Sequence, residues 1–280
     1  MPTGNLLCLS AHAFHRLAFV EWGDVENERV LICAHGLTRN GRDFDFLAQA
    51  LQDQYRVMCP DAPGRGRSDW LAVKDDYNYS TYCSNMAALI AWLQTDQLDW
   101  VGTSMGGIIG MLLAAQPNSP IRRLVINDIG PFVPKTALER IARYVGTNPG
   151  FANKDDAERY LREIHAGFGP LTDAQWAHLA QHSVRRDTDS HYRLTYDPAI
   201  GRPLQEKPIE DLDLWTTWDS IRCPVLVIRG AESDLLLAET AAEMQRRGPP
   251  MRLVELAGVG HAPALMADDQ IAIVRDWLLS

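Results

Sequence analysis

The chain has 280 residues, of which 46% are hydrophobic and 22% charged, and its formal net charge at pH 7 is -9. This is the composition of a globular protein with one large core, or with a core and an inserted segment. The acidic excess argues against nucleic acid and anionic membranes as partners.

The five cysteines are scattered and odd in number. Cys33, Cys59 and Cys223 lie in or beside apolar runs, so we expect small buried residues in a reducing compartment and no disulfide framework. No CxxC or clustered His/Cys pattern indicates zinc, and we predict neither a metal nor a cofactor. We see no signal peptide, and no apolar run approaches the roughly 20 residues of a membrane span, so we expect a cytoplasmic protein.

Strand-like and helix-like segments alternate along most of the chain. The expected strands are 14–21, 29–34, 55–59, 98–101, 121–127, 223–229 and 251–256. The expected helices are 43–51, 80–94, the apolar run after Ser104, 238–247 and 270–279. This alternation predicts an α/β fold whose mostly parallel central sheet carries helices on both faces.

The alternation breaks between residues 129 and 218. We expect no strand there, but three helices at 135–144, 155–168 and 172–184, together with many aromatic residues. Both ends of this stretch return to the same sheet, and about 90 residues is small for an independent second domain. We therefore predict a core formed by 1–128 and 219–280, with 129–218 inserted as a helical lid over the site.

The stretch 98–116 carries the strongest chemical signal. A short apolar run is followed by Gly102-Thr103-Ser104-Met105-Gly106 and then by an apolar, alanine-rich run. This is the G-x-S-x-G pattern between a strand and a helix, where a strained turn raises the central serine above the sheet. The flanking glycines leave room for the tight turn. We predict that Ser104 is a nucleophile, and the alternative is a flexible Gly/Ser turn.

A serine hydroxyl needs a base that accepts its proton, and in a fold of this kind the order along the chain is nucleophile, acid, histidine. His261 lies in a glycine-rich loop after the last expected strand, and of the eight histidines it alone combines these two features. We predict that His261 is the base. The histidines of the insertion are expected to be solvated or to cap helices: His165, His178, His182 and His191.

Two aspartates could orient the imidazole. Asp234 follows the expected strand 223–229, and Asp128 follows the expected strand 121–127. An aspartate after a strand is more often a turn or cap residue, but either one could accept an imidazole N–H and stabilise the charged ring. We favour Asp234 as the acid, with Asp128 as the alternative and Glu232 as a third candidate.

The tetrahedral intermediate of an acyl transfer needs two aimed N–H donors. Met105, directly after the nucleophile and at the start of a helix, is expected to supply one of them. Leu37, which follows His35 and Gly36, is expected to supply the other. We interpret His35 itself as a structural residue that hydrogen-bonds the turn.

Together these motifs resemble those of the α/β-hydrolase superfamily over nearly the whole chain. They are His35-Gly36, Asp61-x-x-Gly64-x-Gly66-x-Ser68, Gly102-Thr103-Ser104-Met105-Gly106, Gly230-x-x-x-Asp234 and Gly260-His261. The resemblance implies the α/β-hydrolase fold, a structural loop at 61–68, and these site residues: the triad Ser104, Asp234 and His261, and an oxyanion hole of Leu37 and Met105.

Two positions distinguish this chain from some members of the superfamily. Thr38 stands where many haloperoxidase-like and epoxide-hydrolase-like members have proline. The serine at position 104 argues against dehalogenases and epoxide hydrolases, which carry aspartate at the elbow.

We predict a serine hydrolase of the carboxylesterase type that forms an acyl-enzyme on Ser104. The aromatic lid, with Phe132 and Trp215, suggests a small to medium, largely apolar ester substrate. Enzyme alternatives are a lactonase or a C–C hydrolase of ring-cleavage dienoates, whose carboxylate Arg39 or Arg42 could hold, although we expect both arginines to be solvated. A slow-turnover receptor for a small ligand is the alternative outside the enzymes. A homodimer is compatible with the sequence.

Overall fold

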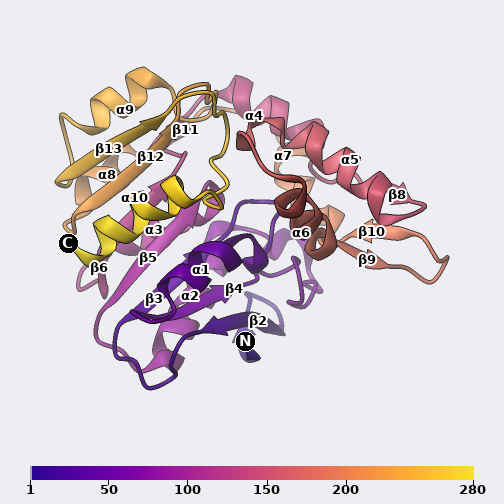
Figure 1. Ribbon diagram of the computed structural model, residues 1–280, viewed down its shortest axis with the longest axis horizontal. Helices are drawn as coiled ribbons and strands as arrows, with labels where there is room; N and C mark the ends of the chain where they lie inside the picture. Colours follow the sequence, from indigo (N-terminus) through magenta and orange to yellow (C-terminus); the bar gives the residue numbers. More distant parts are fainter. Residues whose placement is uncertain (1) are drawn as a thin grey trace.

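The computed structural model describes residues 2–280. Its centre is a mixed eight-stranded sheet in the order β1-β2-β4-β3-β5-β6-β12-β13 (Figure 1). The strands are β1 (Thr3–Leu9), β2 (Phe14–Trp22), β3 (Val30–Ala34), β4 (Arg56–Pro60), β5 (Leu98–Thr103), β6 (Ile121–Asn127), β12 (Val225–Gly230) and β13 (Met251–Leu256). β2 pairs antiparallel with β1 and β4, and the other pairs are parallel. The predicted α/β fold with a mostly parallel sheet is therefore confirmed.

The parallel strands are buried on both faces because helices cover both. In β3, Leu31 and Cys33 pack into one group of buried residues, and their neighbours Val30 and Ile32 pack into the other. Two helices cover the first face, α1 (Asp45–Leu51) and α10 (Asp268–Leu279), which lie in front of the sheet in Figure 1. Four cover the second face: α2 (Tyr79–Leu93), α3 (Met105–Ala114), α8 (Trp215–Ser220) and α9 (Ala238–Met244). This double cover explains the near-continuous apolar runs in the sequence.

Strand β1 was not among the expected elements. It is an edge strand in which Leu7 and Leu9 are exposed, so it lacks the apolar pattern of the inner strands. Its register with β2 places Leu6 opposite Leu17. The hairpin formed by β1 and β2 therefore has one face toward the core and one toward solvent.

The segment 129–218, called the insertion below, contains the three expected helices but also short strands. Its helices are α4 (Lys135–Ala142), α5 (Lys154–Ile164), α6 (Asp173–Ser183) and the short α7 (Arg202–Gln205). The prediction of no strand was wrong. One small sheet joins β8 (Gly150–Phe151), β10 (Tyr192–Leu194) and β9 (Val184–Arg186), and another joins β7 (Phe132–Val133) and β11 (Leu212–Asp213). These strands have two or three residues each, too few for a periodic pattern to predict them.

Short 3₁₀ turns complete the secondary structure. They lie at Gly41–Phe44, Lys74–Asp76, Ala166–Phe168 and Pro198–Gly201. The turn at Gly41–Phe44 runs directly into α1, and the turn at Ala166–Phe168 follows α5. The second of these turns ends α5 earlier than the sequence predicted.

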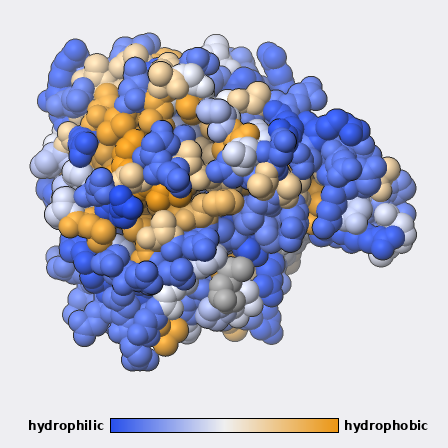
Figure 2. Space-filling view, viewed as in Figure 1, coloured by the Kyte–Doolittle hydropathy of each residue, from blue (hydrophilic) through white to orange (hydrophobic). Residues whose placement is uncertain are grey.

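The insertion projects from one side of the core (Figure 1, right). Figure 2 shows mainly hydrophilic residues over its projecting tip in this view. Polar contacts tie it to the core, among them Lys74 Nζ to Asp197 Oδ2 at 2.5 Å.

Of the cysteines, Cys33 and Cys59 are buried as expected, whereas Cys223 is only partly buried. Among residues 2–280, no helix combines the length and the apolar character needed to cross a membrane.

The hairpin offers a matched test of this packing. Leu17 in β2 is 0% exposed and Leu7 in β1 is 63% exposed. We expect Leu17→Ala to lower the free energy of unfolding by roughly 2–5 kcal/mol, because it leaves a cavity in the core. Leu7→Ala should stay within about 0.5 kcal/mol of the wild type. Urea unfolding of both variants measures the difference, and equal midpoints would contradict the register of β1 and β2.

Candidate active site

Ser104 stands at a tight turn between β5 and α3. Its backbone has φ 51° and ψ -113°, a conformation that is rare for a residue with a side chain. The turn needs glycine on both sides. A Cβ on Gly106 would lie 1.9 Å from the carbonyl oxygen of Ala34, and one on Gly102 would lie 2.2 Å from that of Gly106. The predicted strand–turn–helix elbow at Ser104 is therefore present.

The imidazole of His261 lies between Ser104 and Asp128. Its Nε2 is 3.0 Å from Ser104 Oγ, and its Nδ1 is 2.9 Å from Asp128 Oδ2. His261 belongs to the loop after β13, and Asp128 follows β6 in a left-handed conformation with φ 56°. Serine, imidazole and carboxylate thus form one hydrogen-bonded chain. This geometry lets the imidazole accept the serine proton while the carboxylate accepts the opposite N–H.

The prediction that Asp234 accepts the hydrogen bond of His261 was wrong, and the alternative Asp128 occupies that position. Asp234 lies four residues beyond β12 and forms an ion pair with Arg140 of the insertion, with Nε to Oδ2 at 2.5 Å. The physical reason is a turn: the amide of Ser233 donates to the Gly230 carbonyl, and this loop points Asp234 outward. The third candidate, Glu232, is exposed.

The loop after β12 contributes to the site in another way. Ser233 Oγ donates to Asp128 Oδ2 at 2.6 Å, and the amide of Gly230 donates to Asp128 Oδ1 at 2.8 Å. With His261, three donors hold the fully buried carboxylate of Asp128. No local signal in the sequence marks Ser233, because its role depends on β12 lying beside β6.

The two amides predicted to bind the oxyanion belong to residues near Ser104. Met105 follows Ser104 in the chain, and a Cβ on Gly36, the residue before Leu37, would lie 3.8 Å from Ser104 Cβ. Within residues 2–280, the N–H groups of Leu37 and Met105 find no hydrogen-bond acceptor. Arg65, which is fully buried, donates from Nε to the Leu37 carbonyl at 2.9 Å and lies 3.7 Å from Met105 Sδ. Arg65 therefore contacts both residues, although the sequence predicts only a structural loop at its position.

His35 holds the loop that carries Leu37. Its Nδ1 lies 2.7 Å from the Gly36 carbonyl, and the amide of Ala62 donates to its Nε2 at 2.9 Å. Burial, more than any neighbouring charge, lowers the pKa of His35 to about 4, so the ring is neutral at pH 7. These contacts agree with a structural role for His35.

The loop implied at 61–68 is likewise held from within. Asp61 Oδ1 accepts from the amide of Gly41 at 2.7 Å, and its Oδ2 accepts from the amide of Arg67 at 2.9 Å. Burial raises the pKa of Asp61 to about 6, and these two amide donors oppose the rise. Ser68 Oγ donates to the Asp61 carbonyl, which closes the loop.

Arg39 differs from the expectation of a solvated arginine. Its side chain is buried, and its guanidinium donates to both carboxylate oxygens of Asp43, at 2.8 and 2.7 Å. A third bond, from Nη1 to Ser183 Oγ at 2.8 Å, links the core to α6 of the insertion. Most of its donors are thus used within the protein, which leaves few for a substrate carboxylate.

The aromatic residues predicted to bind substrate lie in different surroundings. Trp215, at the start of α8, has its ring 4.9 Å from the guanidinium of Arg247, which follows α9. The structure thus places it beside the segment that follows α9. Phe132 lies in β7, four residues after Asp128, and is partly exposed. A substrate contact of Phe132 stays a prediction.

His165 is the C-terminal cap residue of α5, one of the two roles predicted for it, and it is not solvated. It is buried, and its ring stacks on Phe168 with centroids 4.5 Å apart. Burial first, and then the charges of Arg39 and His261, hold its pKa well below the usual value, so it is neutral. His182 of α6 is half-buried, and burial lowers its pKa to about 4. The burial of the His165 and His182 rings comes from the tertiary fold, not from a local sequence pattern.

The insertion meets the loop that carries His261. The amide of Gly260 donates to the Gly167 carbonyl at 2.8 Å. Beside Thr103 lies a cavity of about 30 Å³, whose lining includes Phe168 and Leu179 of the insertion and Ala262 after His261. This is room for about one water molecule, and Ser104 beside Thr103 is only partly buried.

A larger hollow lies elsewhere on the core. It measures about 640 Å³ and is an open groove lined by Trp22, Asn27 and Gln52, among others, and none of the triad residues takes part in it. Size alone therefore does not mark the reactive centre, because the groove lacks the serine–histidine–aspartate chemistry.

The chain is similar to known proteins over nearly its whole length. The model of the alpha/beta hydrolase family matches residues 31–274. The chain is 47% identical to the 3-hydroxybutyrate-oligomer hydrolase of Cupriavidus necator, over 98% of this chain and 96% of that protein.

Solved structures give the same fold. A protein from Rickettsia typhi has a TM-score of 0.94 and 34% identity, with 100% of this chain and 99% of that chain covered. An alpha/beta hydrolase from Novosphingobium aromaticivorans has a TM-score of 0.87 and 35% identity, with 99% and 98% covered.

The two aspartates can be separated by kinetics. We expect Asp128→Asn to lower kcat on an activated ester by roughly 10³–10⁴-fold, because an amide in place of the carboxylate favours the wrong imidazole tautomer. Asp234→Asn should cost less than about tenfold, since it removes only a half-exposed ion pair. Steady-state kinetics with p-nitrophenyl esters measures both, and a larger loss in Asp234→Asn would return the acid role to Asp234.

His35 predicts a pH dependence of stability. The ordinary histidine pKa is about 6.5, and burial lowers that of His35 to about 4. Between these values the unfolded chain binds a proton that the folded chain does not, so stability falls as pH falls. From pH 7 to pH 5 we expect the wild type to lose about 2 kcal/mol more unfolding free energy than His35→Gln.

The comparison uses the pH slope and not the absolute stability of the variant. Asp61, with its raised pKa, acts in the opposite direction over part of this range, but it is present in both proteins. His191→Gln, at an exposed loop position, is the control and should keep the wild-type slope. Equal slopes for wild type and His35→Gln would mean that His35 protonates in the folded state.

Proposed function

The chain belongs to the alpha/beta hydrolase family and is a hydrolase that acts on ester bonds, and from this premise we propose that it cleaves oligomers of 3-hydroxybutyrate through an acyl-enzyme on Ser104. The hydrogen-bonded chain from Ser104 through His261 to Asp128 is the observation that carries the mechanism. The 47% identity to a 3-hydroxybutyrate-oligomer hydrolase over nearly the whole chain supports the substrate class.

In the proposed reaction, Ser104 Oγ attacks the ester carbonyl while His261 Nε2 takes its proton. Asp128 accepts the Nδ1 hydrogen and offsets the positive charge of the imidazolium. The negative oxygen of the tetrahedral intermediate is bound by the amides of Leu37 and Met105. His261 then gives the proton to the leaving alcohol, and a water molecule, activated in the same way, releases the acid and restores Ser104.

We also propose that the insertion acts as a lid in this reaction. The hydrogen bond between Gly260 and Gly167, and the place of Phe168 and Leu179 beside the small cavity, support this role. We expect the insertion to move, in part or whole, when an oligoester enters and leaves the site.

The other enzyme candidates have less support from the side chains. A C–C hydrolase of dienoates would need a cation for the substrate carboxylate, and Arg39 already donates to Asp43 and Ser183. A lactonase would use the same serine chemistry, and a slow-turnover receptor would keep the triad but release product slowly. Substrate comparison separates these cases.

We expect the protein to hydrolyse 3-hydroxybutyrate dimer and trimer with a kcat/KM above those for simple lactones and for a ring-cleavage dienoate. Chromatography of the released 3-hydroxybutyrate measures the first reaction, and absorbance measures the last. A higher kcat/KM on the dienoate would overturn the ester assignment. Tight binding with barely any product release would instead indicate a receptor.

Removal of the nucleophile should abolish this activity. We expect Ser104→Ala to lower kcat on the order of 10⁴-fold or more, because no oxygen remains to form the acyl-enzyme. A fluorophosphonate should label the wild type once, at Ser104, as read by peptide mass spectrometry. Ser84→Ala, at an exposed position of α2, is the matched control and should keep full activity. Retained esterase activity in Ser104→Ala would show that another residue is the nucleophile.

A further inference from the structure

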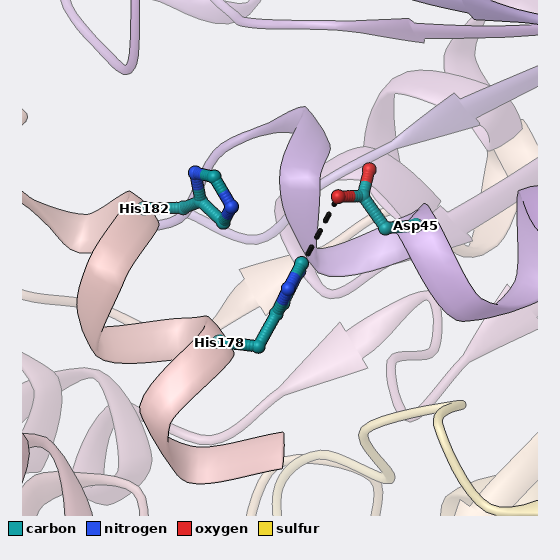
Figure 3. Close-up of side chains that lie close together, drawn as sticks. All are labelled: Asp45, His178 and His182. Carbon is teal, nitrogen blue, oxygen red and sulfur yellow. Dashed lines mark ion pairs between the residues drawn. The ribbon is translucent and has the colours of Figure 1, made fainter. Parts of the chain in front are cut away.

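We propose that Asp45, His178 and His182 form a binding site for a divalent transition-metal ion of the zinc type. Figure 3 shows the three side chains gathered between α1 of the core and α6 of the insertion. One ligand atom from each residue lies within 4.8 Å of the other two. Two imidazoles and one carboxylate are a ligand set that suits Zn²⁺. The site uses none of the residues placed in the esterase mechanism.

The backbone holds the two histidines in a fixed relation. They are four residues apart on α6, so both side chains leave the same face of the helix. Their ring centroids are 4.7 Å apart. A capping box formed by Thr172 and Gln175 fixes the start of this helix. The spacing of the two rings therefore does not depend on a flexible loop.

Asp45 supplies the observation that points to a ligand. It is the first residue of α1 and only 5% exposed, yet its Oδ1 has no hydrogen-bond partner among residues 2–280. An unpaired buried carboxylate oxygen is costly, and a bound cation would satisfy it. The other oxygen, Oδ2, lies 3.4 Å from Nε2 of His178, the contact that is dashed in Figure 3.

The histidines have nitrogen atoms available. The ring of His182 makes no hydrogen bond within the described residues, although it is half-buried. In His178, Nε2 lies 3.0 Å from the Arg42 carbonyl, and Nδ1 has no partner in the same part of the chain. A cation between the rings would bind one nitrogen from each.

Arg42 is the competitor that a metal must displace. Its Nε donates to Asp45 Oδ2 at 2.7 Å, and its Nη2 also pairs with that oxygen. The Arg42 side chain is 23% exposed, so it can swing into solvent when a metal takes the carboxylate. Arg42 and a bound metal would compete for Asp45 Oδ2, so removing Arg42 is expected to tighten metal binding. A cluster that only stabilises the fold would show no such gain.

The proposal is tested with the full chain, first stripped with a chelator and then dialysed against Zn²⁺. Metal analysis should give about one Zn²⁺ per chain for the wild type. Calorimetry should show at least a tenfold loss of affinity in His182→Ala and a gain in Arg42→Gln. His191→Ala, an exposed histidine of the insertion, is the matched control and should bind as the wild type does.

Zn²⁺ binding by a triad variant and the effect of Zn²⁺ on the Tm test the proposal further. His261→Ala should retain Zn²⁺, since the proposed site does not involve the triad; loss of binding in this variant would place the metal at Ser104 and overturn the proposal. Excess Zn²⁺ should raise the Tm of the wild type by about 5 °C and leave that of His182→Ala unchanged. Circular dichroism checks that His182→Ala is folded. Equal Zn²⁺ binding by wild type and folded His182→Ala would also overturn it.

Discussion

The close packing of the turn between β5 and α3 is the constraint on which the rest of the site depends. A Cβ on Gly106 would come within 1.9 Å of the Ala34 carbonyl oxygen, and the indole N–H of Trp100 donates to the Gly106 carbonyl from inside the core. The helix is therefore held against β3, and Ser104 is held at its strained φ. The parallel strands around β5 end at the same edge of the sheet, which is why residues after β3, β6 and β13 meet there.

A second feature of the site is the buried positive charge of Arg65. Arg65 is buried without a carboxylate partner among residues 2–280; it is held by the Leu37 and Pro63 carbonyls, the hydroxyl of Tyr82 and nearby aromatic rings. In the proposed mechanism, negative charge develops at the amides of Leu37 and Met105, and the Arg65 guanidinium contacts the carbonyl of the first and the side chain of the second. A fixed positive charge near these residues favours such an oxygen without reorganisation.

The insertion and the core share polar contacts as well as apolar ones. Arg39 joins Asp43 to Ser183, Gly167 accepts from Gly260, and the proposed metal ligands span the same boundary. Contacts of this kind can be broken and remade at lower cost than a dry apolar interface, because water satisfies the separated groups. This is the property that a segment needs if it is to admit an oligoester and then close over it.

The sequence by itself determined the α/β architecture, the elbow at Ser104 and the histidine loop at 258–261, because strand periodicity, glycine spacing and chain order are local signals. It favoured Asp234 over Asp128 wrongly, since both follow buried strands and only the loop geometry after β12 turns Asp234 toward Arg140. The inward positions of His165 and Arg65 were likewise set by tertiary structure alone. Burial and hydrogen-bond partners come from residues distant in the chain, and no local pattern encodes them.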